Sequence, residues 1–322
     1  MIEIFDPTTM NDLLFLYLKK DDLFLIRLNN NISMIHQERN KKLIEKIHRK
    51  KGVKNLQIEP EEDTLSFFMF NRINFNDPEI REDVCNLSST NIHFYGEYID
   101  HFPKCDPEDA LFQGAKKLLF TRYEDDYIWK LPENIGDFQN LEELSAYYAG
   151  LTKDLPESIS RLSNLKRLDL SSNAFVTFPE VITKLKNLEE LDLASNHPEN
   201  AFNIVDSTFD SIPESIGRMQ SLKRLVLKGN RLKKVPKTIG HLENLETLDL
   251  SHNELSSLPK SIENLKNLQQ LNLYWNNFEF EELDGMKQKL EQLRNISEKI
   301  EVMKTTLKHI RPLIQQGTQI KL

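Results

Sequence analysis

The sequence predicts an α/β solenoid, because one pattern of apolar residues, asparagine and proline recurs along the chain at a fixed period. The pattern L-x-x-L-x-L-x-x-N-x-L-x-x-L-P-x-x-I-x-x-L is clearest from Leu245 onward, and the next copy starts 23 residues later, at Leu268. Such a period is the signature of stacked units, each of which buries its apolar face against its neighbours. We therefore expect one elongated core within the 322 residues, not several globular domains.

The countable units begin at Ala115, Leu141, Leu165, Leu188, Leu222, Leu245 and Leu268, with spacings of 26, 24, 23, 34, 23 and 23 residues. Each unit predicts a strand, a turn and a short helical return. The alternating leucines of L-x-L share one side of a strand and should line the core. The asparagine that follows should turn the chain and pair backbone groups that would otherwise be buried without partners, as a ladder of Asn173, Asn196, Asn230, Asn253 and Asn276.

The proline that ends the apolar pattern lacks an amide hydrogen and suits the first turn of a helix. It occurs at Pro132, Pro156, Pro179, Pro213, Pro236 and Pro259. Together these motifs resemble the leucine-rich repeat family across residues 115–280, and the L-P-x-x-I form is similar to its intracellular 23-residue subclass. The resemblance implies a horseshoe with a curved parallel sheet, a concave face that binds proteins, and no catalytic residues.

Residues 1–51 are expected to form an N-terminal helical module, with Pro7 in the first helix and Asp22 capping a second helix over residues 23–28. A third helix is expected from about Ile32 to Ile47, and its basic face is interpreted as a solvated surface, with an anionic partner surface as the alternative.

Part of this module resembles the N-terminal half of an F-box, the helical motif that links substrate-binding domains to cullin ubiquitin ligases. The resemblance rests on Pro7, Leu14, Leu18 and the run from Lys20 to Leu23, and it departs from the motif at residues 29–31, which are all asparagine. It implies an alternative function, that of a ligase substrate receptor docking a Skp-type adaptor through residues 7–35.

Residues 52–114 are expected to be divergent or capping repeats, with strand-like pieces at residues 56–58, 73–75 and 92–94. The same stretch holds four residues of zinc-ligand type, namely Cys85, His93, His101 and Cys105. Only the last pair has the close spacing that structural zinc sites show. We therefore interpret the cysteines as buried free thiols and expect no metal.

Residues 281–322 carry apolar residues in steps of three and four, from Leu283 to Ile314, and are expected to form a C-terminal helical cap. A single helix of about 29 residues would be about 43 Å long, more than the end of a solenoid requires. The pattern therefore favours a capping hairpin and a monomer over a dimerisation helix and a homodimer.

The repeat register converts the sequence into a map of the concave face. Its charged pairs alternate in sign from Lys116-Lys117 to Glu142-Glu143 and onward, so neighbouring strands about 4.8 Å apart should pair them with one another. The remaining exposed positions are the candidate partner-binding residues. They are Tyr147, Tyr148, Asp169, Asp192, Lys228, Asp249, His252, Tyr274 and Trp275.

Aromatic residues lie at both ends of this map and small residues lie between them. Tyrosine and tryptophan commonly anchor protein interfaces, but Tyr274 and Trp275 could instead pack beneath the C-terminal segment. Two insertions, within residues 197–211 and 123–129, are further candidates for recognition loops.

The composition fits a soluble protein, and the repeat resemblance implies a non-enzymatic protein-binding scaffold. The net charge of −8 argues against nucleic-acid binding by a basic face, and no uncharged run reaches the roughly 20 residues of a membrane span. Two cysteines and an acidic N-terminus indicate a cytoplasmic protein, or one acting in a host cytoplasm if it is a bacterial effector. No catalytic arrangement or glycine-rich phosphate loop is present, so we expect no enzyme activity and no cofactor.

Overall fold

The computed structural model describes residues 26–27, 42, 64–69, 81–82, 85–87, 90–96, 106, 108–121, 130–152, 155–196, 209–278 and 318–321. Its strands form one sheet in chain order, antiparallel between β1 and β2 and parallel from β2 to β11. The strands are β1 (Ile26–Arg27), β2 (Thr64–Met69), β3 (Asn91–Gly96), β4 (Lys117–Thr121), β5 (Glu143–Ser145), β6 (Arg167–Asp169), β7 (Glu190–Asp192), β8 (Arg224–Val226), β9 (Thr247–Asp249), β10 (Gln270–Asn272) and β11 (Gln319–Lys321).

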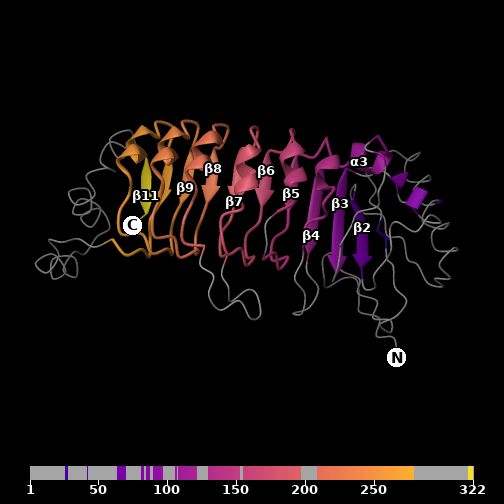
Figure 1. The fold of residues 1–322 in the computed structure, drawn as a ribbon, viewed down its shortest axis with the longest axis horizontal. Coiled ribbons are helices and arrows are strands. Elements are labelled where there is room, and N and C mark those ends of the chain that lie inside the picture. Colours follow the sequence, from indigo (N-terminus) through magenta and orange to yellow (C-terminus); the bar gives the residue numbers. More distant parts are fainter. Residues whose placement is uncertain are drawn as a thin grey trace, which may run out of the picture.

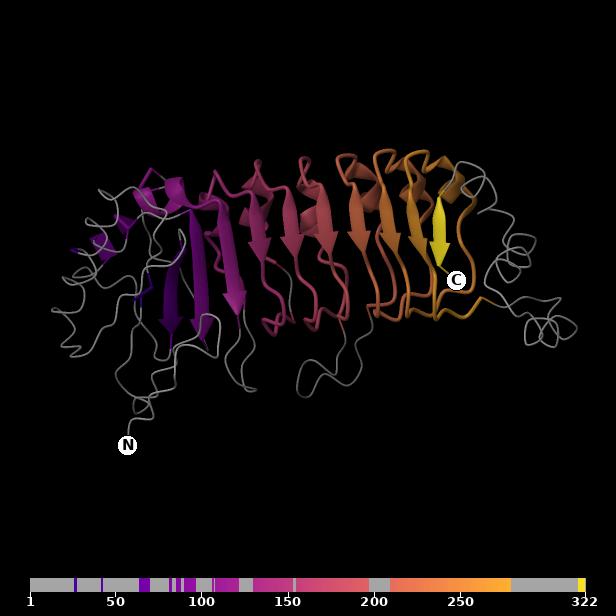
Figure 2. The ribbon, with the colours of Figure 1, turned by 180° about the vertical axis from the view of Figure 1, so that it is seen from behind.

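Short helical segments accompany the strands along the array (Figure 1). They are α3 (Ala110–Gly114) and the 3₁₀ helices η1 (Ile135–Asp137), η2 (Glu157–Arg161), η3 (Glu180–Lys184), η5 (Glu214–Arg218), η6 (Lys237–His241) and η7 (Lys260–Asn264). Seen from behind, the strands stand side by side along one face, with the helical turns behind them (Figure 2). This is the predicted α/β solenoid.

The predicted repeat register is confirmed by the strand pairing. The second leucine of each unit pairs with its counterpart in the next, as Leu168 does with Leu191 and Leu191 with Leu225. These leucines are 2% exposed or less and form one core that runs the length of the array. The strand-pairing register is maintained across the 34-residue unit, so the extra residues do not interrupt the sheet.

In η2, η3, η5, η6 and η7 the proline is the N-cap, one residue earlier than the predicted first turn, whereas η1 has Asn134 as its N-cap. In η2 the amide of Ile159 donates to the carbonyl of Pro156 at 3.0 Å. The same contact recurs at Ile216 and Ile239, with their own prolines. The missing proline amide therefore costs no intrahelical hydrogen bond.

The asparagine ladder is also confirmed. Asn173 is fully buried, and its side-chain amide donates to the carbonyls of Ala146 at 2.8 Å and Leu170 at 2.9 Å. Its Oδ1 accepts from the amides of Ala149 and Leu151. Each asparagine thus ties two successive units together at the turn.

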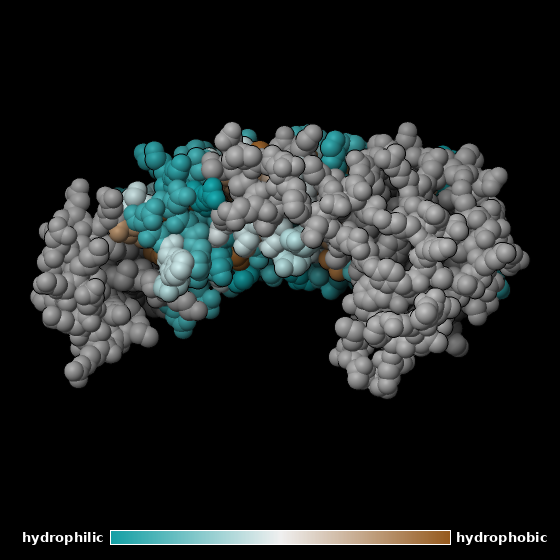
Figure 3. Space-filling model, turned by 90° about the horizontal axis from the view of Figure 1, so that it is seen from below, coloured by the Kyte–Doolittle hydropathy of each residue, from teal (hydrophilic) through white to brown (hydrophobic). Residues whose placement is uncertain are grey.

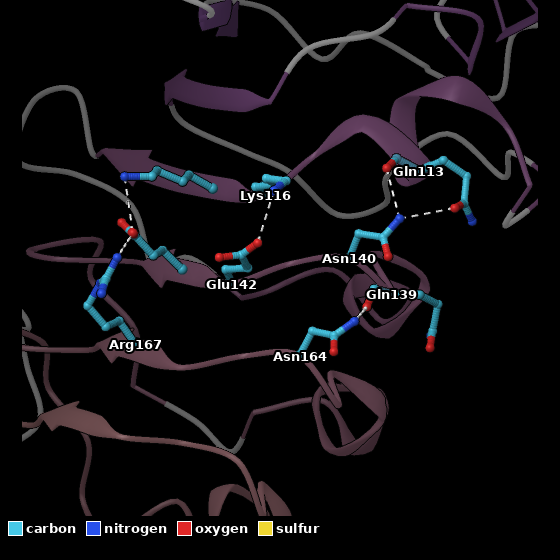
Figure 4. Close-up of polar contacts among 9 residues, drawn as sticks. Gln113, Lys116, Gln139, Asn140, Glu142, Asn164 and Arg167 are labelled. Atoms are coloured by element: carbon cyan, nitrogen blue, oxygen red, sulfur yellow. Dashed lines mark hydrogen bonds and ion pairs between the residues drawn. The ribbon is translucent and has the colours of Figure 1, made fainter. Parts of the chain in front are cut away.

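A second ladder, which the sequence reasoning missed, lies at the start of the strands. Asn140 donates to the Gln113 carbonyl at 3.0 Å and Asn164 to the Gln139 carbonyl at 2.8 Å, each one unit back in the chain (Figure 4). Equivalent bonds of 2.7–2.8 Å start at Asn187, Ser221, Asn244 and Asn267. The asparagine before each first leucine, replaced by serine before Leu222, was the available signal.

The N-terminal expectation is wrong at two residues. Ile26 and Arg27, placed by the pattern in a helix, form β1 and pair antiparallel with Phe67 and Ser66 of β2. An apolar run this short fits either period, and pairing with β2 satisfies backbone groups that an open sheet edge would leave exposed. Of residues 1–51, the structure describes only these two and Lys42, which is helical, so the remaining helices and the adaptor segment 7–35 lie largely outside the described residues.

The divergent segment contributes strands to the same sheet. Strand β3 contains the predicted piece at residues 92–94, whereas β2 was not predicted and the pieces at 56–58 and 73–75 lie outside the described residues. Cys85 is buried and disulfide-bonded, which corrects the expectation of a free thiol and removes it as a thiolate metal ligand. His101 and Cys105 lie outside the described residues.

At the C-terminal end, residues 319–321 form β11 and pair in parallel with β10, where the pattern placed them in a helical cap. An unpaired edge strand favours such an addition because it presents free backbone donors and acceptors. The predicted helix over residues 283–314 and most of both insertions lie outside the described residues. Phe209, at the end of the larger insertion, is buried and its ring lies 6.0 Å from that of Phe178.

Candidate protein-binding face

The solvent-facing side chains of strands β4–β10 and of the turn after each strand form what we call the strand face. In β5 the middle residue, Leu144, is buried, whereas Glu143 and Ser145 on either side of it are half-buried and point outward. The face is hollowed between β3 and β8 by a cavity of 640 Å³, with Glu143, Asp169 and Asp192 among its lining residues. This hollow has the shape expected of the concave side of a solenoid.

The predicted charge pairing between repeats is confirmed at the N-terminal end of the strand face. Lys116 contacts Glu142 at 3.1 Å and Lys117 contacts Glu143 at 3.0 Å, and Arg167 contacts Glu143 from the other side (Figure 4). Farther along, Lys223 lies 2.7 Å from Glu189.

These contacts set the pKa values of two exposed carboxyl groups. The hydrogen bond from Lys116 lowers the pKa of Glu142, and the one from Lys223 lowers the pKa of Glu189. Surface pairs of this kind contribute little to stability. Because these charges already pair within the array, the paired residues are not candidate binding groups.

Three aspartates line the centre of the strand face at the same register. Asp169, Asp192 and Asp249 are half-buried, and each accepts a hydrogen bond from the amide two residues later, at 2.8–3.0 Å. Burial raises the pKa of Asp192, and the neighbouring charges of Asp169 and Asp249 raise it further, against the smaller opposing effect of the Ala194 amide. Burial thus disfavours the charged form of the Asp192 carboxyl group.

The residue eight positions into each unit has a left-handed backbone. Its φ is +51° at Tyr148, +54° at His252 and +54° at Trp275, and glycine occupies the same place at Gly229. Only glycine adopts this conformation without cost, whereas other residues are strained by roughly 1–2 kcal/mol. The structure thus holds bulky aromatic side chains where its backbone favours glycine.

Four of the predicted aromatic residues are exposed, in two groups. Tyr147 is 53% and Tyr148 43% exposed, with ring centroids 6.2 Å apart. At the other end Tyr274 is 48% and Trp275 65% exposed, and the ring of His252 lies 5.0 Å from that of Trp275. The alternative that Tyr274 and Trp275 pack beneath the C-terminal segment concerns residues 279–317, which lie outside the described residues.

Between the two aromatic groups the side chains of the strand face are small or polar. The intervening positions hold Ser171, Ala194, Ser251 and the exposed Lys228. Seen from below, the described repeats are mostly hydrophilic, with small hydrophobic spots (Figure 3). Five strand steps separate the groups, a distance of about 24 Å. The structure thus brings all nine predicted residues to one face but divides the aromatic ones between its ends.

The strand face offers no arrangement for metal chemistry. Within the described ranges, no three His, Cys, Asp or Glu side chains are grouped to hold a metal ion.

Burial lowers the pKa of His93, in β3, to about 3. No helix in the described part of the chain is long and apolar enough to cross a membrane.

The fold and the face define a class: a solenoid of parallel strands with short helical returns and a hollowed, polar strand face. A family comparison specifies the repeats. The leucine rich repeat family matches residues 138–197 and 209–278, so these residues are leucine-rich repeats, as their motifs predicted. Comparison with curated protein sequences finds no match.

A solved structure with a TM-score above 0.5 supports the fold. Listeria monocytogenes InlP shares 18% identity with a TM-score of 0.52, over 77% of this chain and 68% of InlP. The leucine-rich repeat domain of the type III effector XopL shares 22% identity with a TM-score of 0.49, over 78% of each chain. The plant peptide hormone receptor RGFR1, solved with RGF2, shares 21% identity with a TM-score of 0.44, over 60% of this chain and only 30% of the receptor.

Proposed function

We propose that this chain is a non-enzymatic interaction scaffold that binds a partner protein on its strand face. The observation that carries the proposal is the pair of exposed aromatic groups, Tyr147 with Tyr148 and Tyr274 with Trp275. Leucine-rich repeats supply the supporting class, since solenoids of this kind present extended binding surfaces.

These aromatic residues lower the folding stability of the free protein at the positions they occupy. Tyr148 and Trp275 occupy strained backbone positions, and their exposed rings recover little of the free energy that burial would give. A partner that covers the rings would recover it. Tyrosine and tryptophan are the residues most enriched at the energetic centres of interfaces.

The spacing of the two groups limits the shape of the partner. An element that contacts both must span about 24 Å across the strands, which is roughly 16 residues of helix or seven of extended chain. The serines and alanine between the groups let such an element lie close to the sheet.

The test compares proteins recovered from a lysate by the wild-type chain with those recovered by Tyr147→Ala/Tyr148→Ala and Tyr274→Ala/Trp275→Ala. We expect each double variant to bind the main partner about tenfold or more weakly. The matched control is Arg161→Ala/Lys184→Ala, which removes exposed groups of η2 and η3. Equal recovery by all four proteins would contradict the proposal.

The other expectations stay predictions. Nothing among the described residues favours the ligase-receptor alternative, and β1 contradicts a helix at Ile26 and Arg27 within the segment 7–35. The effector role, the monomeric state and the cytoplasmic location are likewise untested. The disulfide at Cys85 counts against the location, because disulfides persist mainly in oxidising compartments.

A further inference from the structure

The three aspartates of the strand face differ in how completely their carboxylates are hydrogen-bonded. Asp169 Oδ1 accepts from the amide of Ser171 at 3.0 Å and from its hydroxyl at 2.5 Å, and Oδ2 accepts from the Ser145 hydroxyl at 3.3 Å. Both oxygens of Asp169 are therefore engaged within the array.

Asp249 has the same arrangement. Its Oδ1 accepts from the amide and hydroxyl of Ser251 at 2.9 and 2.6 Å, and its Oδ2 from the side-chain amide of Asn272 at 3.1 Å. A serine two residues after the aspartate and a polar residue on a neighbouring strand thus complete the carboxylate in both units.

Asp192 lacks both additions. Alanine stands at position 194, so Oδ1 receives only the Ala194 amide, at 2.8 Å. On the next strand Val226 pairs with Asp192 in register and offers no donor. Among the described residues, nothing donates to Asp192 Oδ2.

The surroundings of this oxygen suit a cation. Asp192 lines the 640 Å³ hollow, together with Asp169 and Glu190. Arg167 and Arg224 also line the hollow, but Arg167 is already paired with Glu143. Burial disfavours the charged form of Asp192 even though the positive charge of Arg224 lies nearby. A bound cation would favour that charged form.

We propose that Asp192 is the anchor for an arginine side chain of the partner protein, whose guanidinium donates to Oδ2 in the hollow. Arginine fits better than lysine because its guanidinium is more weakly hydrated and presents planar paired donors to a carboxylate. Val226 pairs in register with Asp192 and is only 5% exposed, so its methyl groups lie beside the site and can report binding. This inference rests on the proposed function, since it assigns partner chemistry to the same face.

The decisive variant is Ala194→Ser, which leaves the net charge at −8 but supplies the hydroxyl found at Ser171 and Ser251. The probe is an acetylated, amidated Gly-Arg-Gly peptide, with the citrulline peptide as its uncharged match. Binding is followed by the methyl signals of Val226. Asp192→Asn removes the charge, and Asp249→Asn removes an equal charge from an already completed carboxylate.

We expect a saturable shift of the Val226 methyls with the arginine peptide only. Affinity should fall about tenfold in Asp192→Asn, the worth of one charged hydrogen bond, and several-fold in Ala194→Ser, while Asp249→Asn stays near wild type. Equal affinity for both peptides, or no loss in Asp192→Asn, would overturn the inference. The proposed function would survive that result if the aromatic double variants still lost the partner.

Discussion

The side-chain amide of Asn253 lies 2.9 Å from the carbonyl oxygen of Leu227, one unit earlier in the chain. It also donates to the Leu250 carbonyl, and Oδ1 accepts from the amide of Leu232. A single side chain therefore satisfies backbone groups of two units at a turn that is closed to solvent.

Replacement of this residue tests the ladder. Asn253→Ala should lower the free energy of unfolding by about 2–5 kcal/mol, because several buried backbone groups lose their partners at once. Urea denaturation followed by circular dichroism measures the change. Asn267→Ala, in the exposed second ladder, is the matched control and should cost about 1 kcal/mol or less. Equal losses would show that burial does not decide the energetics of the two ladders.

Asp192→Asn should stabilise the protein at neutral pH. The folded-state pKa of Asp192 is raised above its ordinary value of 3.8, so the charged form is penalised on folding at every pH above that raised pKa. Asparagine keeps an oxygen for the Ala194 amide without the charge. The melting temperature should rise at pH 7, and the gain should shrink as the pH falls towards 3.8. A lower melting temperature at pH 7 would contradict the raised folded-state pKa of Asp192.

His93 should destabilise the fold in acid. Its folded pKa is about 3 against 6.5 in the unfolded chain, so between these values the unfolded state binds one more proton. The free energy of unfolding should therefore fall by up to about 1.4 kcal/mol per pH unit as the pH drops below 6.5. His93→Gln should remove this dependence in urea titrations from pH 7 to pH 4, whereas the exposed His241→Gln should not.

The cysteines offer a chemical test of the N-terminal region. Protein purified without reductant and then denatured should show no reactive thiol, because Cys85 is disulfide-bonded and the chain has only two cysteines. Reduction should release two thiols per chain and lower the melting temperature. Two thiols before reduction would contradict the bond and restore the expectation of free cysteines.

Most of the repeat architecture could be predicted because its causes are local and periodic. Leu248, Asn253 and Pro259 each have a role that a fixed spacing reveals. Strands β1 and β11 could not be predicted, because residues 26–27 and 319–321 become strands only by pairing with sheet edges formed by residues distant in the sequence.

The site was predictable as a surface but not in its energetics. The register placed Tyr147 and Trp275 on one face, and both are exposed. It did not reveal the strained backbone at Trp275, or that Ala194 leaves Asp192 less completely bonded than Asp169. Those differences depend on hydrogen-bond geometry between units. A comparison of the residues two positions after each aspartate could have suggested the incomplete hydrogen bonding of Asp192.

Photocrosslinking tests the central claim most directly. A photoreactive phenylalanine is introduced at Tyr147 or Trp275 on the strand face, or at Ser160 in η2 as the control, and each protein is irradiated in a lysate. We predict that positions 147 and 275 join the same partner protein and that position 160 does not. Adducts from position 160 alone, with none from positions 147 and 275, would contradict binding on the strand face.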